Sequence, residues 1–452
     1  MPRDLPGHHD RADRRRNHPR SAVGHDADRR ERQPPAAARP LPPVPADAAR
    51  HLSPQVRRPH PCYRSRRRNL VTSTSPTEAV TLDSSGGRAL FAQADTFRAA
   101  GPAVRVNLPG DVTAWAVTRG AVAKFLLTHE HVSKDARKSW PSHTHGSIPW
   151  LYPWVDVVSM FTSDGADHQR LRRLVDRAFT PARIEAMRPA VEEIVTGLLD
   201  HLETLAPTGP VDLRAHFSYR IPTEVICDLF GVPIDQRPEM LRVIDSVLTT
   251  DVTLQQAEAI KRDLDQAMQA LIDAKRSHPG KDMTSLLLAA HEEDGDRLSH
   301  TELISTLILM IGAGSETAVA LINAAVRELL AHPEQLAAVL ADPARWSDVI
   351  DEALRLHPPI MYMPLRYATA DIDLGDGIVI RQGDAIIVSF GAHGRDPEIH
   401  QNPEAFHIDR DDKQHLAFGY GIHYCLGARL AKLEAEVALP ALFERFPQLA
   451  LT

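Results

Sequence analysis

Apolar residues recur at helical spacing over most of the chain from about residue 82 onward, and this pattern predicts a mainly α-helical fold. The periodic stretches lie at 122–127, 167–174, in several pieces between 190 and 278, and at 301–324. Proline and glycine break the middle region at 207–210, 231–233 and 279–280. Because these residues punctuate regular structure, we expect several separate helices there, joined by short turns.

Alternation typical of β-strands is confined to short runs. Val104–Leu108 and Ala114–Val117 flank a Pro-Gly-Asp sequence, which predicts a hairpin. The runs 378–380 and 385–388 flank Arg381-Gln382-Gly383, and we predict a second hairpin there. The β region is therefore expected to be small.

Residues 1–70 differ from the rest of the chain in composition. They contain 17 Arg, no Lys, 7 acidic residues and 12 of the 35 prolines, with little hydrophobic periodicity. Their local charge is +10, which leaves −17 for residues 71–452 because the whole chain carries −7. Such a segment buries too little apolar surface to offset chain entropy, so we predict a disordered Arg/Pro-rich extension at 1–70 and a single domain at 71–452.

Three interpretations of this extension compete. A nucleic-acid-binding arm would need interleaved aromatic residues, and Tyr63 is the only one, so no nucleic-acid partner is expected. A secretory signal would need an apolar segment that is absent here, and the acidic residues argue against a transit peptide. The third interpretation is that the segment is not native: methionine is absent between Met1 and Met160, and we expect the natural chain to start near Val71.

The three cysteines, Cys62, Cys227 and Cys425, are far apart and odd in number, which predicts no disulfide framework and favours a reducing, cytoplasmic environment. Cys227 lies in an apolar segment and is expected in the core. The longest apolar run, 303–322, contains Glu316 and glycines, so a membrane span is not expected.

The chemically most informative stretch is 418–427, where Cys425 lies between a Gly-rich loop and an apolar run at helical spacing. Glycines let backbone N–H groups approach the sulfur, and a helix N-terminus stabilises negative charge, so both features favour thiolate over thiol. A lone cysteine is otherwise often a small buried hydrophobe. The pattern thus leaves two roles open, a metal-ligating thiolate and a core residue.

The helix predicted at 301–324 has an unfavourable middle, 312–317. Each of its glycines costs roughly 1 kcal/mol relative to alanine, and Glu316 brings a carboxylate into an apolar stretch. Breaks of local rules are typical of functional sites. Small residues let a backbone approach a flat ligand, and the hydroxyl of Thr317 beside an acid can carry protons.

Two other helical segments place charged residues on one face. His168 and Arg172 are four residues apart, whereas Arg170 and Arg173 point elsewhere, toward solvent or an acidic protein partner. Glu352 and Arg355 are three apart and can pair, although an exposed pair contributes at most about 1 kcal/mol. Spacing alone therefore gives these residues no special role.

Together these segments resemble the cytochrome P450 family. The haem-binding loop of that family is matched at Phe418, Gly419, Gly421, His423, Cys425 and Gly427, the oxygen-activation motif at 313–317, and the Glu-x-x-Arg motif at 352–355. The motifs follow in the family's order, and the resemblance covers about residues 82–451. It implies the cytochrome P450 fold, mainly α with a small β region, with haem b between the long central helix and the Cys-ligand loop.

The resemblance also implies residue roles. Cys425 would be the axial ligand of the haem iron, and Thr317 and Glu316 would deliver protons during oxygen activation. Further haem contacts would come from His168, Arg172, Ala313, Gly314, Arg366, Phe418, Gly419, His423 and Gly427. Glu352 and Arg355 would form a structural pair with Arg410 as third partner, and the substrate pocket would include Trp150 from a roof loop at 140–154, Met310, Ala313, Met361 and Met363.

The implied reaction is the insertion of one oxygen atom from O₂ into a small apolar molecule, such as a steroid, a macrolide or another polyketide, as in soluble actinomycete enzymes. The chain has no flavin or iron–sulfur motif, so electrons from NAD(P)H would arrive through a separate ferredoxin and ferredoxin reductase. Two alternatives stay open: a haem-thiolate enzyme that uses peroxide or couples and dehydrates substrates, and a non-catalytic haem-binding copy.

The chain departs from the family pattern at three places. Tyr420 stands where relatives often have histidine. Pro440 falls inside the helix that follows Cys425 and is expected to kink or end it. The sequence stops at Thr452, earlier than the pattern leads us to expect, and a pocket that lacks one wall is the expected consequence.

Overall fold

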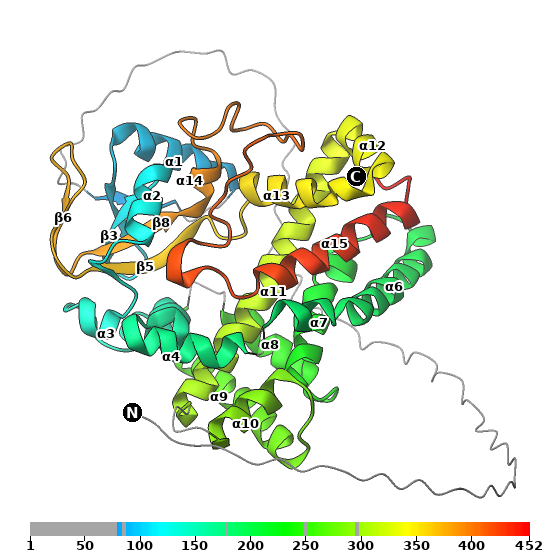
Figure 1. Ribbon diagram of the computed structural model, residues 1–452, viewed down its shortest axis with the longest axis horizontal. Coiled ribbons are helices and arrows are strands. Elements are labelled where there is room, and N and C mark those ends of the chain that lie inside the picture. The colour runs from blue at the N-terminus through cyan, green and yellow to red at the C-terminus, as the bar shows by residue number, and fades with distance from the viewer. Residues whose placement is uncertain (1–78, 84–86, 178, 248–251, 294–297) are drawn as a thin grey trace, which may run out of the picture. The chain divides into compact units, whose positions relative to one another are not determined.

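The computed structural model describes residues 79–83, 87–177, 179–247, 252–293 and 298–452. The predicted extension at 1–70 and the expected start near Val71 lie outside the described residues. Within the described part, most helices lie together, and a smaller β region lies to one side of them, at the upper left of Figure 1. The prediction of a mainly helical fold with a small β region is confirmed.

Helices account for most of the described chain. They are α1 (Gly87–Ala100), α2 (Gly120–Leu127), α3 (Ala136–Ser139), α4 (Gly165–Asp176), α5 (Pro181–Glu185), α6 (Arg188–Leu205), α7 (Arg220–Phe230), α8 (Arg237–Val247), α9 (Leu254–Ser277), α10 (Met283–Glu293), α11 (His300–Ala331), α12 (Pro333–Ala341), α13 (Trp346–Leu356), α14 (Phe390–Gly394) and α15 (Ala428–Arg445). Short helical turns lie at η1 (Pro149–Leu151), η2 (Tyr152–Asp156), η3 (Met160–Thr162), η4 (Ala206–Thr208), η5 (Arg214–Ser218), η6 (Pro343–Arg345) and η7 (Gly421–His423).

Helix α11 is the central element of the helical part. It begins with a capping box, in which the Ser299 side chain accepts from the Glu302 backbone N–H and the Glu302 side chain accepts from the Ser299 N–H. Its Met310 and Ile311 belong to a cluster with α4, α7, α8, α9 and α10, whereas Leu321 belongs to a second cluster with α6, α7, α13 and α15. Because α11 is common to both clusters, it holds the two halves of the helical core together.

A six-stranded sheet of order β1-β2-β3-β8-β5-β4 forms the β region. Its strands are β1 (Val80–Thr81), β2 (Val104–Leu108), β3 (Val112–Val117), β4 (Val132–Ser133), β5 (Tyr362–Ala368) and β8 (Ala385–Ser389), and a separate pair is formed by β6 (Ile372–Asp373) and β7 (Val379–Ile380). The first predicted hairpin is confirmed, because β2 and β3 pair antiparallel.

The second predicted hairpin is wrong in its pairing. Strand β7 pairs with β6, and β8 pairs with β3 in parallel and with β5 antiparallel. All five residues of β8 are buried, which suits a central strand and not the arm of a small hairpin. Tertiary burial therefore chose partners that are distant in the sequence.

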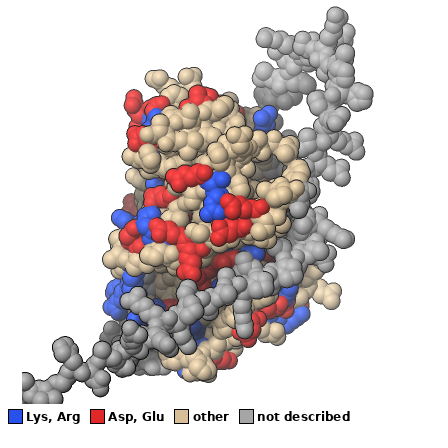
Figure 2. Space-filling view, turned by 90° about the vertical axis from the view of Figure 1, so that its right-hand side faces the viewer, with Lys and Arg blue, Asp and Glu red and all other residues tan. Residues whose placement is uncertain are grey.

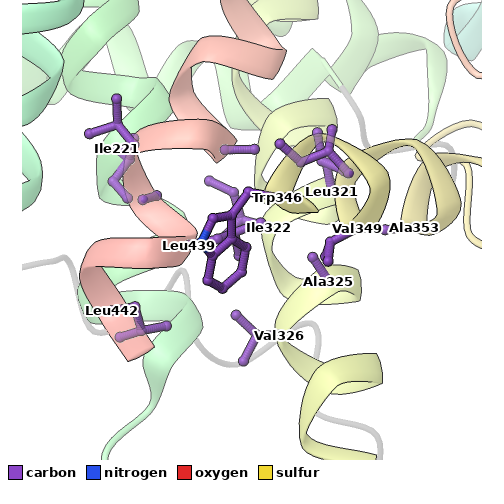
Figure 3. Close-up of a cluster of buried hydrophobic side chains, with 14 of the residues drawn as sticks. Ile221, Leu321, Ile322, Ala325, Val326, Trp346, Val349, Ala353, Leu439 and Leu442 are labelled. Atoms are coloured by element: carbon purple, nitrogen blue, oxygen red, sulfur yellow. The ribbon is translucent and has the colours of Figure 1, made fainter. Parts of the chain in front are cut away.

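Of the two outcomes expected at Pro440, the end of the helix does not occur, since α15 continues through it to Arg445; a kink stays a prediction. The lost backbone hydrogen bond costs about 3 kcal/mol or more in a helix interior. On either side of the proline, Leu439 and Leu442 are fully buried and pack in the same cluster as Trp346 and Ile322 (Figure 3). This apolar packing keeps the helix in place despite the proline.

Helix α11 is, within the described part of the chain, the one helix that is long and apolar enough to cross a membrane by length and composition. Of its most apolar window, 56% is buried inside the protein, as is common for a core helix.

The acidic balance of residues 71–452 is visible on the molecular surface. Figure 2 shows one face on which acidic side chains gather around fewer basic ones. Near the ends of α6 and α15, Asp200 and Glu203 flank Arg445 at 2.8 and 3.1 Å. A face of this sign is unsuited to the phosphate backbone of nucleic acids.

Candidate functional site

The loop that carries Cys425 is held in a tight conformation by its glycines. Gly419 and Gly421 have φ angles of 73° and 77°, a left-handed region that glycine adopts at little cost. The Cys425 N–H donates to the Phe418 carbonyl at 2.8 Å, which closes the loop, and α15 begins three residues after the cysteine. The expected placement of this cysteine between a Gly-rich loop and a helix is confirmed.

The environment of the Cys425 thiol is mixed. The residue as a whole is exposed, yet burial of the thiol raises its pKa. The backbone N–H groups of Gly427 and Ala428 and the charge of Arg172 act against this rise. Leu426, the next residue, packs against the cluster that contains Met310 and Ile311 of α11. Three groups near the thiol, the two N–H groups and Arg172, therefore oppose the effect of burial and would favour a thiolate once a metal replaces the proton.

Helix α11 is continuous, but its turn at Ala313, called here the open turn, is exposed on one side. This residue is exposed although Ile311 and Ser315 beside it are buried, so it faces open space within the described structure. The Thr317 hydroxyl donates to the Ala313 carbonyl at 2.8 Å, one turn earlier. Gly314 faces α7, where a Cβ would come within 2.7 Å of the Ile226 side chain. A side chain at position 314 would therefore force the Ile226 side chain to move, and the contact of Gly314 with a cofactor stays a prediction.

Glu316 is held by a partner that the sequence did not indicate. The Nη2 atom of Arg214, in η5, donates to both carboxylate oxygens of Glu316 at 2.8 and 2.9 Å. Residues 214 and 316 are 102 positions apart, so neither spacing nor motif could have paired them.

A second group of polar residues gathers beside the Cys loop. Arg366 on β5 is buried, and its Nη1 atom has no hydrogen-bond partner among the described residues. The Nε2 atom of the buried His168 on α4 is likewise without a partner there, and the His168 ring meets that of His423 edge to face at 4.5 Å. Burial lowers the pKa of Arg366 to about 10 and that of His423 to about 4. This buried group thus contains one guanidinium nitrogen and one imidazole nitrogen without a partner among the described residues.

Asp164, which the sequence reading missed, is the acid nearest to this group. Its carboxylate accepts from the Ser133 hydroxyl, from the Lys134 N–H at 2.7 Å, and from His423 Nε2 at 3.5 Å. These hydrogen bonds hold the pKa of Asp164 well below its ordinary value, although burial opposes them. Its position just before α4 could have been noticed as an N-cap signal, but its contact with the Cys loop could not.

Two arginines of α4, Arg172 and Arg170, have different partners. Arg172 donates to the Tyr424 carbonyl at 2.9 Å and so reaches the residue before Cys425. Arg170, expected to point to solvent or to an electron-transfer partner, forms an ion pair with Glu302 of α11. That expectation is wrong for Arg170, because the first turn of α11 supplies a carboxylate within reach.

Glu352 and Arg355 form a fully buried ion pair, with 0% of either side chain exposed. Arg355 Nε and Nη2 each donate to a Glu352 oxygen at 2.8 Å. Arg410 Nε lies 3.3 Å from the same carboxylate, so the predicted third partner is confirmed. These residues join α13 to the loop that leads to Cys425.

The four predicted pocket residues outside α11's open turn lie in different surroundings. Met310 belongs to the helical core, whereas Trp150 packs against the sheet and donates its indole N–H to the Pro109 carbonyl at 3.0 Å. Met363 also packs against the sheet, and the Met361 carbonyl accepts from the Phe390 N–H at 2.9 Å. Their contact with a substrate stays a prediction.

Comparisons with known proteins agree with this geometry. The Cytochrome P450 family profile matches residues 91–342 and 346–449. The chain is 44% identical over 358 residues to the 2-hydroxy-5-methyl-1-naphthoate 7-hydroxylase of Streptomyces carzinostaticus, a match that covers 78% of this chain and 87% of that protein. It is 39% identical over 345 residues to the 6-deoxyerythronolide B hydroxylase of Saccharopolyspora erythraea, covering 75% and 84%.

A solved structure, that of CYP154A1 from Streptomyces coelicolor A3(2), is similar with a TM-score of 0.78 and 45% sequence identity, over 83% of this chain and 94% of that one. The chain therefore belongs to the cytochrome P450 family and is a P450 monooxygenase of the bacterial type. The predictions of family, fold and enzyme class are confirmed.

Family membership implies haem as the cofactor, and the residues of this chain fit it. Haem carries two propionate carboxylates, and the group beside the Cys loop contains a buried guanidinium and a buried imidazole with open donors, Arg366 and His168. A buried guanidinium is expensive without an acceptor, and a buried ring nitrogen also costs free energy when it has no hydrogen-bond partner. A thiol for the iron and a helix that is open at Ala313 complete the arrangement.

Proposed function

We propose that the enzyme inserts one oxygen atom from O₂ into a small, apolar, polyketide-like molecule, with electrons supplied by a separate ferredoxin and its NAD(P)H-dependent reductase. The observation that carries this proposal is the open turn of α11, where the Thr317 hydroxyl lies one turn from the exposed Ala313 and beside an ion-paired Glu316.

We call Cys425, Arg366, His168 and His423 the haem cradle, and the role proposed for each follows from its side-chain chemistry. Haem with a thiolate ligand supplies the activation of O₂ when it is bound. Cys425 would give the thiolate, with the Gly427 and Ala428 N–H groups and Arg172 reducing its excess charge. Arg366, His168 and His423 would bind the propionates through charged or strongly polar hydrogen bonds.

Thr317 and Glu316 would take part in proton delivery to the reaction site. A hydroxyl has one donor and two acceptor lone pairs. The Thr317 hydroxyl donates its hydrogen bond to the Ala313 carbonyl, so its lone pairs stay free to accept one. Glu316 would exchange protons with water while Arg214 of η5 holds its carboxylate in place.

The substrate class rests on the relatives and on side-chain chemistry. The names of the two related hydroxylases specify a naphthoate and 6-deoxyerythronolide B as their substrates. In this chain, Met310, Met361 and Met363 would line an apolar pocket with flexible side chains, which adapt to bulky substrates. A polyketide-derived ring system is the class that we propose.

The electron donor would dock beside the Cys loop. Tyr420 and Ile422 in that loop and Phe125 on α2 are large apolar residues with 44%, 60% and 48% exposure. Lys124 lies over the Tyr420 ring at 5.8 Å and adds a positive charge. Clustered exposed apolar residues are typical of protein interaction sites, and a soluble electron carrier in the cytoplasm is the partner that we propose.

The first test is the carbon monoxide difference spectrum of the reduced protein. A Soret band at the strongly red-shifted position of thiolate-ligated haem is expected. A band typical of histidine or thiol ligation, or no haem at all, would contradict Cys425 as ligand. Haem uptake with the expected band but without any turnover would favour the non-catalytic alternative.

The second test separates the role of Thr317 from a general effect on α11. Replacement of Thr317 by Ala should raise the amount of NAD(P)H oxidised per product formed, because the acceptor hydroxyl is lost. Ser315→Ala is the matched control, since Ser315 is buried on the same helix and donates to the Ile311 carbonyl at 3.2 Å. Unchanged coupling in the Thr317 variant would count against O₂ activation at this residue and favour a peroxide-driven reaction.

A further inference from the structure

Lys134 is a buried lysine for which neither the motifs nor the proposed mechanism has a role. It follows the edge strand β4 directly and is only 3% exposed. Its ammonium donates to the carbonyls of Pro364 at 2.9 Å and Leu365 at 3.2 Å, and lies 3.7 Å from the centroid of the Phe161 ring. Burying a cation is costly unless specific contacts compensate, so these contacts need an explanation.

The two carbonyls lie at an irregular point of β5. Strand β5 pairs with β8 through Met363 and then through Arg366, and the register shifts between these two residues. Irregularities of this kind leave backbone groups outside the ladder and re-aim the next side chain. Lys134 binds the backbone at the interruption, immediately before Arg366.

The charges around Lys134 and Arg366 are incompletely balanced. Burial and the charge of Arg366 hold the pKa of Lys134 well below its ordinary value, and Asp164 acts in the opposite direction. Asp164 is also the acid whose charge raises the pKa of Arg366 against burial. Two basic side chains thus depend on one carboxylate, which already accepts from Ser133 and two backbone N–H groups.

We infer that Lys134 is a positioning residue of the haem site: it holds the β5 irregularity so that Arg366 presents its guanidinium to a propionate, and it supplies a second positive charge that the cofactor's carboxylates compensate. This inference rests on the proposed haem cradle and adds a residue to it. Lys134 itself would act mainly through Arg366, since its own hydrogen bonds go to the backbone.

The test measures haem loss and redox potential in full-length protein loaded with haem. Lys134→Met is expected to raise the rate of haem transfer to excess apomyoglobin roughly tenfold or more, the usual range when a residue that orients a metal site is removed. The midpoint potential should fall, because a positive charge near the haem no longer favours the ferrous state. Lys134→Arg, which keeps the charge and two donors, should restore much of both.

Two comparisons make the result decisive. Lys138→Met removes an exposed lysine of the same segment, which pairs with Asp135 and Asp167, and should leave both quantities unchanged. In the double variant with Arg366→Met, haem loss should rise by much less than the sum of the two single effects, since Lys134 acts mainly through Arg366. Where Lys134→Met does not fold, Lys134→Gln keeps a donor without the charge and should still lower the potential.

Haem loss and potential equal to the wild type in both Lys134→Met and Lys134→Gln would overturn the inference. Additive effects of the two replacements in the double variant would also overturn it. Failure of the wild-type protein itself to hold haem with the thiolate signature would instead overturn the proposed function, so the two failures are distinguishable.

Discussion

Two buried groups of charged residues in this molecule differ in how completely protein atoms satisfy them. Around Glu352, every nitrogen of the Arg355 guanidinium donates to a carboxylate or to a backbone carbonyl of Gly394, Pro403 or Ala405. Around Arg366, a buried Nη1 atom and the Nε2 atom of His168 have no partner in the described part of the chain.

This difference suits a structural role for the Glu352 group and a ligand-binding role for the Arg366 group. A complete network in a low-dielectric interior stabilises one backbone arrangement, and the Glu352 group joins α13 to the approach of the Cys loop. An incomplete network is costly to the protein alone and becomes favourable when a ligand supplies the missing acceptors. The open nitrogens of Arg366 and His168 are thus compatible with the binding role proposed for them, whereas the Arg355 guanidinium has none.

The largest effect is expected from breaking the complete group. Arg355→Met leaves Glu352 buried without its main partner, which costs about 3–5 kcal/mol. We expect little soluble protein or a strongly lowered melting temperature, measured by circular dichroism without added haem. Arg345→Met is the control, because Arg345 pairs with the exposed Asp409 near the same helix; equal destabilisation by both variants would contradict the distinction.

Removing Arg366 should weaken haem binding strongly and leave the stability of the haem-free protein intact. Arg366→Met is expected to weaken haem binding by roughly 10–100-fold, while the haem-free protein loses no stability, because a buried guanidinium with an open donor disappears. Haem titration and thermal unfolding of the haem-free protein measure the two quantities. Arg381→Met, at an exposed arginine paired with Asp371, should change neither. A haem-free protein that unfolds more easily would show that Arg366 is structural.

Glu434 extends the comparison to a buried acid on α15. It is 2% exposed, one carboxylate oxygen has no partner among the described residues, and burial raises its pKa from 4.5 to about 8. Between these pH values the native state holds a proton that the unfolded chain has lost, so stability falls as pH rises through the window, by up to about 1.4 kcal/mol per pH unit.

Glu434→Gln should remove this slope, so that the variant gains stability over the wild type from pH 5 to 8. Urea unfolding at several pH values measures it. Glu436→Gln is the control, since that residue lies on the same helix and pairs with Arg188 at its surface. Parallel pH profiles of the Glu434 variant and the wild type would contradict the buried, protonated state.

The smallest effect is expected at Arg170, whose ion pair with Glu302 is partly exposed. Arg170→Gln should change the free energy of unfolding by no more than about 1 kcal/mol, since surface pairs contribute little, and should leave haem affinity unchanged. Urea unfolding and haem titration check both. A large loss of haem affinity would show that an arginine of α4 can contribute to haem binding even when it is already paired with a carboxylate.

Much of the site could be predicted because its signals are local. The glycines around Cys425, the helix that follows it and the four-residue spacing of His168 and Arg172 depend on neighbours in the sequence. The same holds for the long apolar helix with its small central residues. Backbone geometry and helical periodicity act over a few residues, so their pattern is visible in the sequence.

What failed or was missed depended on distant partners. The pairing of β8 with β3 and β5, the contact of Arg214 with Glu316 and the place of Lys134 beside β5 each join residues far apart in the chain. Pro440 does not end α15, because its buried neighbours hold the helix in the apolar core on both sides of the proline.

The sequence by itself thus determined the family and the fold class, and it predicted the thiolate candidate and most of the proposed haem contacts, because each is carried by a short motif or a periodic stretch. The tertiary structure alone decided which charges are satisfied and which stay open, since burial and hydrogen-bond partners exist only after distant segments have packed together.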